Sequence, residues 1–448
     1  MKITQNIRKK AENINPNWYF SVLAVFVFLE YVRPQDSYFG FLAPLKIPAI
    51  TLILLAAIFF KNDKRYLKEE VGYKLFIAFW FLTSFSVVYA VNTNGPYQAS
   101  MTLMWMGISF IFPLVIILND IDKLLKFFNY WIFSQALVAV TTILNGGTGP
   151  GGIVSDENDV ACALAMAVPY AFYMYFFSGM SARNKFLLLL AGVLFAAAVI
   201  ISASRGGMLG LGASLMMITL MSKKPVGNSI KITLFILIFG GLILSLFPAA
   251  YIEDMANMTN TEDDTADDRL WSWSISWIMF LDNPIWGVGA GNYPWTNHLY
   301  AELSPMWYEG RHILAGRVAH SLYFTVLPEL GILGVLIYLA ILKVIYSRCK
   351  TIKKIVNQFP DDKNAVKIKL LTSAFQASLV SFMVSSMFIS VLYYPFIYHL
   401  LGLVLVTYKL VVEKYSTALS EKSSKKQGNR DSLRNKNGRR HFLSGKAE

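Results

Sequence analysis

Charged residues are scarce in this sequence. Only 15% of its 448 residues are Asp, Glu, Lys or Arg, whereas 55% are hydrophobic, and soluble domains carry about 25% charged residues. A soluble domain could not bury this much apolar surface. The hydrophobic residues also form runs of about 20, the length at which an α-helix crosses roughly 30 Å of hydrocarbon. The sequence therefore excludes a soluble protein and predicts an integral membrane protein.

The sequence also has only two cysteines and no recognisable nucleotide-binding motif. The two cysteines are Cys162, expected inside a membrane span, and Cys349, expected in a cytoplasmic loop, so no disulfide framework is predicted. The glycine-rich segment 145–152 lacks the Gly-Lys-Ser/Thr ending of a phosphate-binding loop. We interpret it as a turn and predict no nucleotide site.

The apolar runs predict about twelve membrane spans. Their boundaries are accurate to a few residues, because hydropathy marks the existence of a helix better than its ends. The predicted spans are 17–33, 41–60, 71–90, 98–118, 124–144, 159–178, 186–203, 206–221, 230–250, 319–346, 370–390 and 392–412.

The distribution of basic residues predicts the orientation of the chain. With both termini in the cytoplasm, 35 of the 41 Lys and Arg residues fall on the inner side, as the positive-inside rule requires. The outer side keeps Arg33, Lys46, Arg205, Arg269, Arg311 and Arg317. The net charge of +13 thus reflects topology, and no nucleic-acid partner is expected. The basic end is expected to contact anionic membrane lipids.

The expected fold class is an all-α polytopic membrane protein with one large outer, periplasmic loop. We expect residues 1–16 to be a cytoplasmic segment, 17–250 to hold the first nine transmembrane helices, and 251–318 to form the outer loop with an amphipathic helix. Residues 319–412 then hold the last three transmembrane helices, and 413–448 form a basic, disordered cytoplasmic tail.

Arg205 stands out because basic residues are rare on the predicted outer side. It lies in a Ser/Gly turn, Ser202-Ala-Ser-Arg-Gly-Gly-Met-Leu209, between two spans. A guanidinium grips phosphate through two parallel hydrogen bonds, and Gly206 and Gly207 are expected to let a bulky anion approach. The alternative is an arginine that extends towards lipid phosphates. We favour a ligand-binding role.

Arg269 begins a segment that reads as an amphipathic helix, from Asp268 to Leu281. Leu270, Trp273, Trp277 and Leu281 are expected on one face, and Arg269, Ser272 and Ser276 on another. A membrane-surface anchor is the alternative interpretation. The polar face would direct Arg269 along the membrane surface.

Acidic residues gather just before this helix. Carboxylates suit Mg²⁺ or Ca²⁺, but their spacing matches no calcium loop, so we interpret them as solvated charges near a helix N-terminus and expect no metal. The residues are Glu262, Asp263, Asp264, Asp267 and Asp268.

His320 is expected on the first turn of a span, at the outer interface. A histidine there titrates near neutral pH and can take a proton from a hydroxyl, although it could equally cap the loop. Glu329 lies deeper on the far side of the same predicted helix, so we expect it to pair with another helix.

Two of these motifs resemble those of bacterial O-antigen ligases. Arg205-Gly-Gly-Met-Leu209 fits an Arg-x3-Leu motif. His320-Ser321, separated by nine intervening residues from Gly331-Ile-Leu-Gly334, fits a His-[Asn/Ser/Gln]-x9-Gly-x-x-Gly motif. The stretch from Asp268 to Asn292 is similar to part of the large external loop of that family. The resemblance covers roughly residues 150 to 345.

The resemblance implies a membrane glycosyltransferase that depends on a lipid carrier and lies in the bacterial inner membrane. It would move a glycan from undecaprenyl diphosphate to a hydroxyl of a glycan, lipid A core or protein, without a metal or cofactor and with inversion. Arg205 and Arg269 would stabilise the leaving diphosphate, and His320 would act as general base. Arg311 and Arg317 are further candidates for binding the substrate.

The acceptor stays open, because ligases, polymerases and protein oligosaccharyltransferases have overlapping motifs. We rank a ligase first and a surface-polysaccharide polymerase second. A lipid or polysaccharide transporter is the alternative from a different class, but the spans contain few of the charges that a polar cargo would need.

Overall fold

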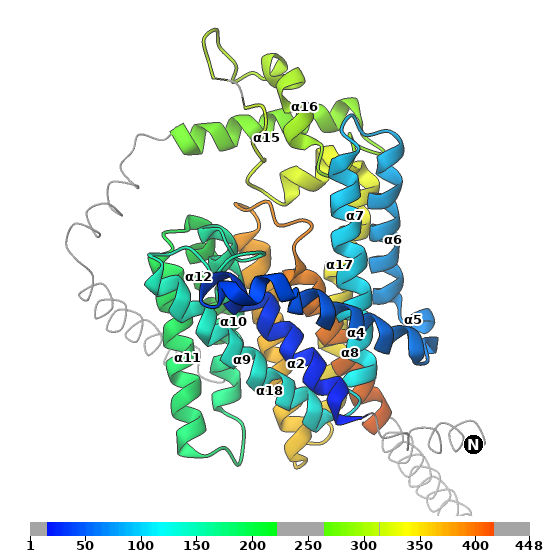
Figure 1. Cartoon of the computed structure of the whole chain (residues 1–448), viewed down its shortest axis with the longest axis vertical. Helices are drawn as coiled ribbons and strands as arrows, with labels where there is room; N and C mark the ends of the chain where they lie inside the picture. Colours follow the sequence, from blue (N-terminus) through cyan, green and yellow to red (C-terminus); the bar gives the residue numbers. More distant parts are fainter. Residues whose placement is uncertain (1–15, 222–263, 313, 416–448) are drawn as a thin grey trace, which may run out of the picture.

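The structure is a computed structural model that describes residues 16–221, 264–312 and 314–415 (Figure 1). Seven of the described helices are long and apolar enough to cross a membrane, and three shorter apolar helices accompany them. The protein is thus a helical, multi-pass membrane protein. The predicted N-terminal segment up to residue 15, the ninth span at 230–250 and the tail beyond residue 415 lie outside the described residues, so the number twelve stays a prediction.

The predicted spans correspond closely to helices wherever the chain is described. The bundle contains α2 (Asn17–Tyr31), α4 (Ile47–Lys61), α6 (Val71–Phe85), α7 (Asn94–Met106) with η3 (Gly107–Ile111) and α8 (Phe112–Ile117), α9 (Ile121–Leu144), α10 (Glu157–Tyr175), α11 (Ala182–Ile201), α12 (Arg205–Leu220), α17 (Tyr323–Val356), α18 (Lys363–Ser385) and a last described helix, Pro395–Tyr415. Short helices join them: α3 (Pro34–Ser37), η1 (Gly40–Leu45), α5 (Arg65–Glu69) and η2 (Ser86–Val88).

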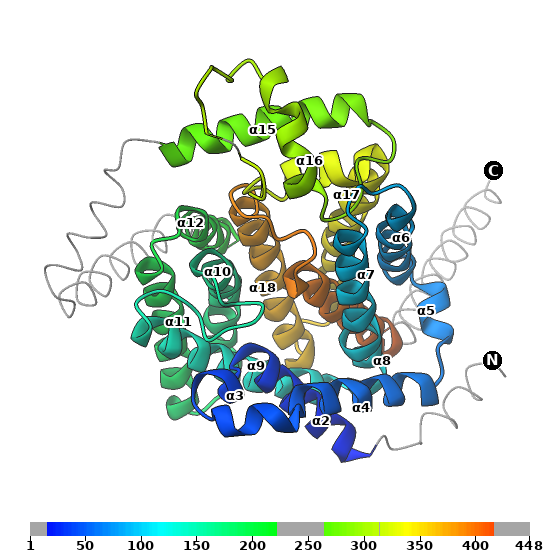
Figure 2. The same ribbon diagram turned by 45° about the horizontal axis from the view of Figure 1, so that its top comes forward.

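Helix α10 lies at the centre of one half of the bundle, where it packs against α11, α12 and α18 (Figure 2). Its alanine-rich sequence makes this possible, because small side chains let neighbouring helices approach closely. Most of its residues are buried. The segment that leads into α10 is therefore fixed relative to the first turn of α12.

The predicted outer loop folds into a cap over one end of the bundle (Figure 1). We use "cap" for residues 264–312 and 314–322, which contain α15 (Asp264–Asp282), α16 (Tyr293–Tyr300) and η4 (Ala301–Leu303). The cap has its own hydrophobic core, formed by Trp271, Ile275, Met279, Tyr293, Ala301, Leu314 and Ala319. This core holds α15 across the bundle end.

Helix α15 covers the segment predicted to be an amphipathic helix. Ser272 and Ser276, expected on the polar face with Arg269, are buried. The backbone carbonyl of Ser272 accepts a hydrogen bond from the Tyr293 hydroxyl at 3.0 Å, so this face packs onto the rest of the cap. Leu270 and Trp277 are exposed on the other side.

Helix α17 is broken near its start, where Gly331 has φ 57° and ψ −160°. The segment that follows α15 docks into this break. Ile332 N donates to Pro284 O at 2.8 Å, and Val288 N donates to Pro328 O at 2.8 Å. These bonds replace helical ones that the break removes, so the cap is joined to the membrane bundle through its backbone.

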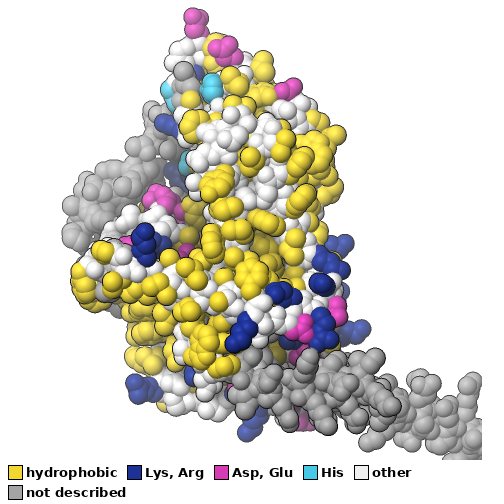
Figure 3. All heavy atoms as spheres, turned by 45° about the vertical axis from the view of Figure 1, so that its right-hand side comes forward, with side chains coloured by type: hydrophobic (Ala, Val, Ile, Leu, Met, Phe, Trp, Pro, Cys, Tyr) yellow, Lys and Arg dark blue, Asp and Glu magenta, His cyan; other side chains and the backbone are white. Residues whose placement is uncertain are grey.

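Side chains on the surface divide along the long axis of the molecule (Figure 3). Hydrophobic side chains cover the middle as a broad belt, and Lys and Arg gather mainly towards the end opposite the cap. This distribution agrees with the predicted excess of positive charge on the inner side. The orientation itself remains a prediction.

Candidate functional site

Arg205 is the first residue of α12 and is exposed at the capped end of the bundle. Ser204 caps the helix: its hydroxyl accepts from Gly207 N at 3.1 Å and donates to Asn158 Oδ1 at 2.8 Å. The helix N-terminus carries a partial positive charge, to which the guanidinium adds. Serine thus fixes where Arg205 emerges, and the local field attracts anions.

Gly206 and Gly207, which follow Arg205, allow close packing and do not open space for a ligand. Gly206 and Gly207 are buried, and a side chain at Gly207 would collide with Ala161 on α10. A side chain at Gly206 would lie 3.1 Å from Phe388 Cβ. The prediction that they make room for an anion is wrong, because both face neighbouring segments and allow close packing.

Arg269 approaches the site from α15, one turn before Trp273. The Trp273 indole stacks on Phe324 with ring centroids 5.0 Å apart, and its Nε1 donates to Ala319 O at 3.0 Å. Ala319 directly precedes His320. Trp273 therefore holds α15 and the His320 segment together, although the sequence suggested only that it was an anchor.

The prediction that His320 lies on the first turn of a span is wrong. Helix α17 begins at Tyr323, and His320 precedes it with a left-handed φ of 49°. Leu322 N donates to Ser386 O at 2.9 Å, which draws this segment towards the end of α18. His320 as a whole residue is exposed, while its ring is partly shielded from water by neighbouring groups.

The electrostatics connect the three predicted residues. Desolvation and the positive charge of Arg269 lower the pKa of His320, whereas the carboxylate of Asp156 acts in the opposite direction. Desolvation and the charge of Arg205 likewise lower the pKa of Arg269. Arg269 on α15 therefore interacts electrostatically with Arg205 on one side of the sequence and with His320 on the other.

Asp156 is a member of this site that the sequence interpretation did not single out. It caps α10, and its carboxylate accepts from Asn158 N at 2.8 Å. An acidic cap before a helix is common, so its position alone gives no sign of function. Only the packing of α10 against α12 brings it near the other residues.

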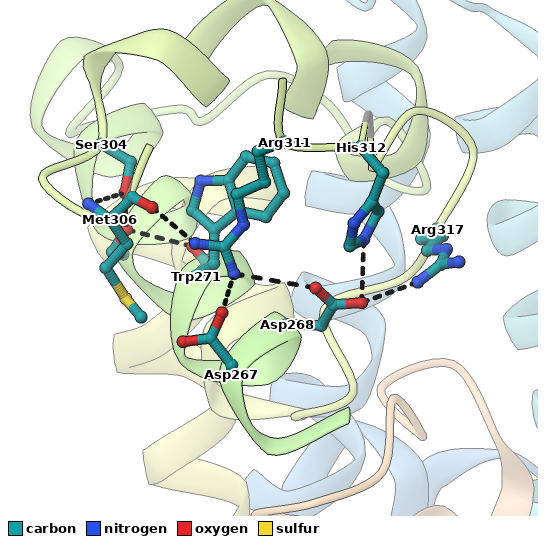
Figure 4. Close-up of polar contacts among 9 residues, drawn as sticks. Asp267, Asp268, Trp271, Ser304, Met306, Arg311, His312 and Arg317 are labelled. Atoms are coloured by element: carbon teal, nitrogen blue, oxygen red, sulfur yellow. Dashed lines mark hydrogen bonds and ion pairs between the residues drawn. The ribbon is translucent and has the colours of Figure 1, made fainter. Parts of the chain in front are cut away.

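Arg311 and Arg317 belong to an ion-pair network in the cap (Figure 4). The Arg311 side chain is 3% exposed, pairs with Asp267 and lies 3.8 Å from Asp268. Asp268 also binds Arg317 at 2.9 Å and His312 at 3.0 Å. For Asp267 and Asp268 the prediction of merely solvated charges is wrong, because they pair with basic residues more than 40 positions away. Glu262 and Asp263 lie outside the described residues.

Glu329 joins the broken α17 to the cap. Its carboxylate accepts from Gly291 N at 2.8 Å, from Tyr293 N at 3.2 Å and from the Tyr393 hydroxyl at 2.8 Å. Glu329 was expected to pair with another helix. Two of its three partners are instead backbone N–H groups of the 291–293 segment, and the third is the hydroxyl of Tyr393, just before the last described helix. Glu329 fixes the cap over the bundle and is not paired with His320.

The structure also locates the glycine-rich segment and the two cysteines. The glycine-rich segment 145–152 is a turn with several positive φ angles, and Pro150 O accepts from the Ser37 hydroxyl at 2.7 Å. Cys162 and Cys349 are both free and buried, with Cys349 inside α17 instead of in a loop. In the described residues, no cluster of three or more His, Cys, Asp or Glu could hold a metal ion.

Fold and site together define a multi-pass membrane protein in which a cap covers one end of the bundle. Arg205, Arg269 and His320 lie at that end. Within the chain, residues 190–339 match the model of the O-antigen ligase family. This match contains Arg205, Arg269 and His320 and implies a role in assembling surface polysaccharides. The chain is also similar to the teichuronic acid biosynthesis protein TuaE of Bacillus subtilis (strain 168), with 23% identity over 349 residues, covering 70% of this chain and 67% of that protein.

Proposed function

We propose that this protein transfers a glycan from a lipid-linked diphosphate to an acceptor hydroxyl on the outer side of the cytoplasmic membrane. The observation that supports the proposal is that Arg205 acts electrostatically on Arg269, and Arg269 on His320. Each comes from a different element, and a purely structural role would not require all three at one place.

The chemistry assigns a role to each residue. The acceptor hydroxyl oxygen attacks the anomeric carbon of the sugar while His320 takes its proton. The bond from this carbon to the diphosphate oxygen breaks, and the electron pair leaves with the diphosphate. Arg205 and Arg269 stabilise the negative charge that develops there. A single displacement of this kind inverts the anomeric carbon.

The setting of His320 suits a base. Desolvation and the positive charge of Arg269 both disfavour the protonated imidazole, and together they lower the pKa of His320. The neutral form, which alone can accept a proton, then predominates at neutral pH. The same arginine can thus both bind the diphosphate and keep the base free of its proton.

A ligase remains our first candidate for the type of transfer, and a polymerase that extends a carrier-linked chain is the second. The matched domain is described as an O-antigen ligase. The similar Bacillus protein is described by the biosynthesis of teichuronic acid, which is a polymer. This second observation keeps the polymerase under consideration.

An in vitro transfer assay tests the proposal. Purified protein receives a carrier-linked oligosaccharide with lipid A core in one reaction and with no added acceptor in another. We expect transfer to the core, whereas chain extension without core would identify a polymerase. Absence of transfer in both reactions, with the carrier still bound, would contradict an enzyme and favour a transporter.

A further inference from the structure

The cap contains a pocket that is separate from Arg205, Arg269 and His320. It has a volume of about 270 Å³ and is lined by residues of α15, α16, η4 and the following loop, namely Trp271, His298, Ala301, Glu302, Trp307, Arg311, His312 and Ala315. Arg205, Arg269 and His320 are not among them. Its size is just below the range of about 300–1,000 Å³ for small-molecule sites, so it suits one compact ring better than an extended chain.

The lining combines an aromatic surface with hydrogen-bonding groups. Trp307 is 38% exposed and offers an indole face. Glu302 supplies acceptors, and His298 can both donate and accept. A sugar ring presents apolar C–H faces and hydroxyl groups around its edge, and each kind of group finds a counterpart here.

Two buried donors in the lining lack partners in the described part of the chain. The Nε1 of Trp271 and the Nε of Arg311 have no hydrogen-bond acceptor, although Trp271 is only 1% exposed. Buried polar groups are nearly always hydrogen-bonded, and a buried indole N–H usually has an acceptor. Both atoms are closed off from solvent, so a ligand oxygen would reach them only after the lining side chains move.

The charges around the pocket favour an uncharged ligand. The Arg311 guanidinium is already paired with Asp267 and lies 3.8 Å from Asp268. It also stacks over the Trp271 ring, 4.0 Å from its centroid, which leaves little freedom to move. The carboxylate of Glu302 would repel an anion. A phosphate or a uronic acid therefore fits worse than a neutral sugar.

We propose that this pocket binds a neutral sugar residue of the glycan, away from the bond that reacts. The inference rests on the proposed glycan transfer and adds a binding subsite to it. Asp268 links the two regions, because it binds His312 at the pocket and also Arg317, whose charge acts on His320. A filled pocket would hold the glycan in place while its reactive end lies near His320.

Saturation-transfer NMR on the full chain tests the subsite directly. Nanodiscs are preferable to maltoside detergent, because the detergent itself carries sugars. The probes are the methyl glycosides of glucose and N-acetylglucosamine, with methyl glucuronide as the anionic counterpart. Trp307→Ala removes the stacking surface, and Glu302→Gln removes an acceptor. Trp295→Ala is the matched control, since Trp295 is an exposed tryptophan of the same cap outside the pocket.

We expect at least one neutral glycoside to receive saturation and Trp307→Ala to weaken its binding about tenfold, because the variant loses the aromatic stacking surface. Glu302→Gln should weaken it too, and Trp295→Ala should not. Failure of both neutral glycosides to bind, full binding by Trp307→Ala, or stronger binding of the glucuronide would overturn the proposal. His320→Ala should keep the signal, so a failure of the proposed transfer remains distinguishable from a failure of the subsite.

Discussion

At the scale of single residues, the site depends on charges placed next to a neutral base. His320 is exposed, and its backbone is held by the contacts of Ala319 and Leu322 with Trp273 and Ser386. Desolvation and Arg269 lower the pKa of His320, and Asp156 raises it. One residue that binds the leaving group in the proposed mechanism, Arg269, thus also acts on the proposed base.

The pH dependence of kcat/KM should report this arrangement. Arg269 lowers the pKa of His320, so Arg269→Gln should raise that pKa and move the acidic limb of the profile to higher pH. Asp156→Asn should move the limb to lower pH, since it removes a charge that raises the pKa. Asparagine still caps a helix, so α10 is preserved. Profiles that coincide for all three proteins would argue against His320 as the titrating base.

Arg205→Lys should reduce kcat on the order of 10²-fold, because a point charge cannot reproduce the two parallel hydrogen bonds of a guanidinium. Steady-state transfer rates measure the effect. Arg183→Lys is the matched control, since Arg183 is also exposed in the first turn of a helix, α11. Near-normal turnover by Arg205→Lys would mean that charge alone is sufficient.

At the scale of elements, the break in α17 is the feature that joins the cap to the bundle. Gly331 creates the break, Glu329 binds the loop backbone, and the 284–293 segment fills the gap. The His-x10-Gly spacing that the sequence displays thus has a physical basis. It sets the number of residues between His320 and the point where the cap docks.

Gly331→Ala should lower the free energy of unfolding by about 1–3 kcal/mol, because only glycine adopts its backbone conformation without strain. A Cβ there would also lie 2.5 Å from Ile285 O. Thermal unfolding in detergent measures the loss. Gly212→Ala in α12 is the control, since nothing lies within 4 Å of its added Cβ, and alanine favours a helix. Equal unfolding temperatures for the two variants would contradict this account.

Hydropathy predicted the described bundle helices well, because each must satisfy its backbone inside an apolar layer. The motifs also predicted Arg205, Arg269 and His320 as candidates. Local sequence could not predict the break at Gly331, since it depends on a loop that precedes it by about 40 residues. The pairing of Arg311 with Asp267 was missed for the same reason, and its burial emerges only once the cap has folded.

At the scale of the whole molecule, apolar surface and charge separate into layers. The belt of hydrophobic side chains lies between the cap and the end where Lys and Arg gather (Figure 3). A cap on the outer side would receive substrates that have already crossed the membrane. The orientation therefore decides which compartment supplies the glycan.

Cysteine labelling on intact cells should establish that orientation. Both native cysteines are fully buried, so introduced thiols give a low background. We expect an impermeant maleimide to label Tyr308→Cys in the cap but not Asp361→Cys between α17 and α18. Both positions are exposed in the structure, and permeabilised cells should show labelling of both. The reverse pattern on intact cells would invert the predicted topology.

Single-turnover transfer by His320→Ala is the measurement that tests the central claim most directly. Protein is loaded with a carrier-linked glycan, the bound carrier is quantified, and transfer after addition of the acceptor is followed beside wild type. We predict that His320→Ala binds the carrier normally but transfers on the order of 10²–10⁴-fold more slowly, the usual contribution of a general base. Transfer at the wild-type rate by the loaded variant would contradict a catalytic His320 and leave the basic cluster as a binding site only.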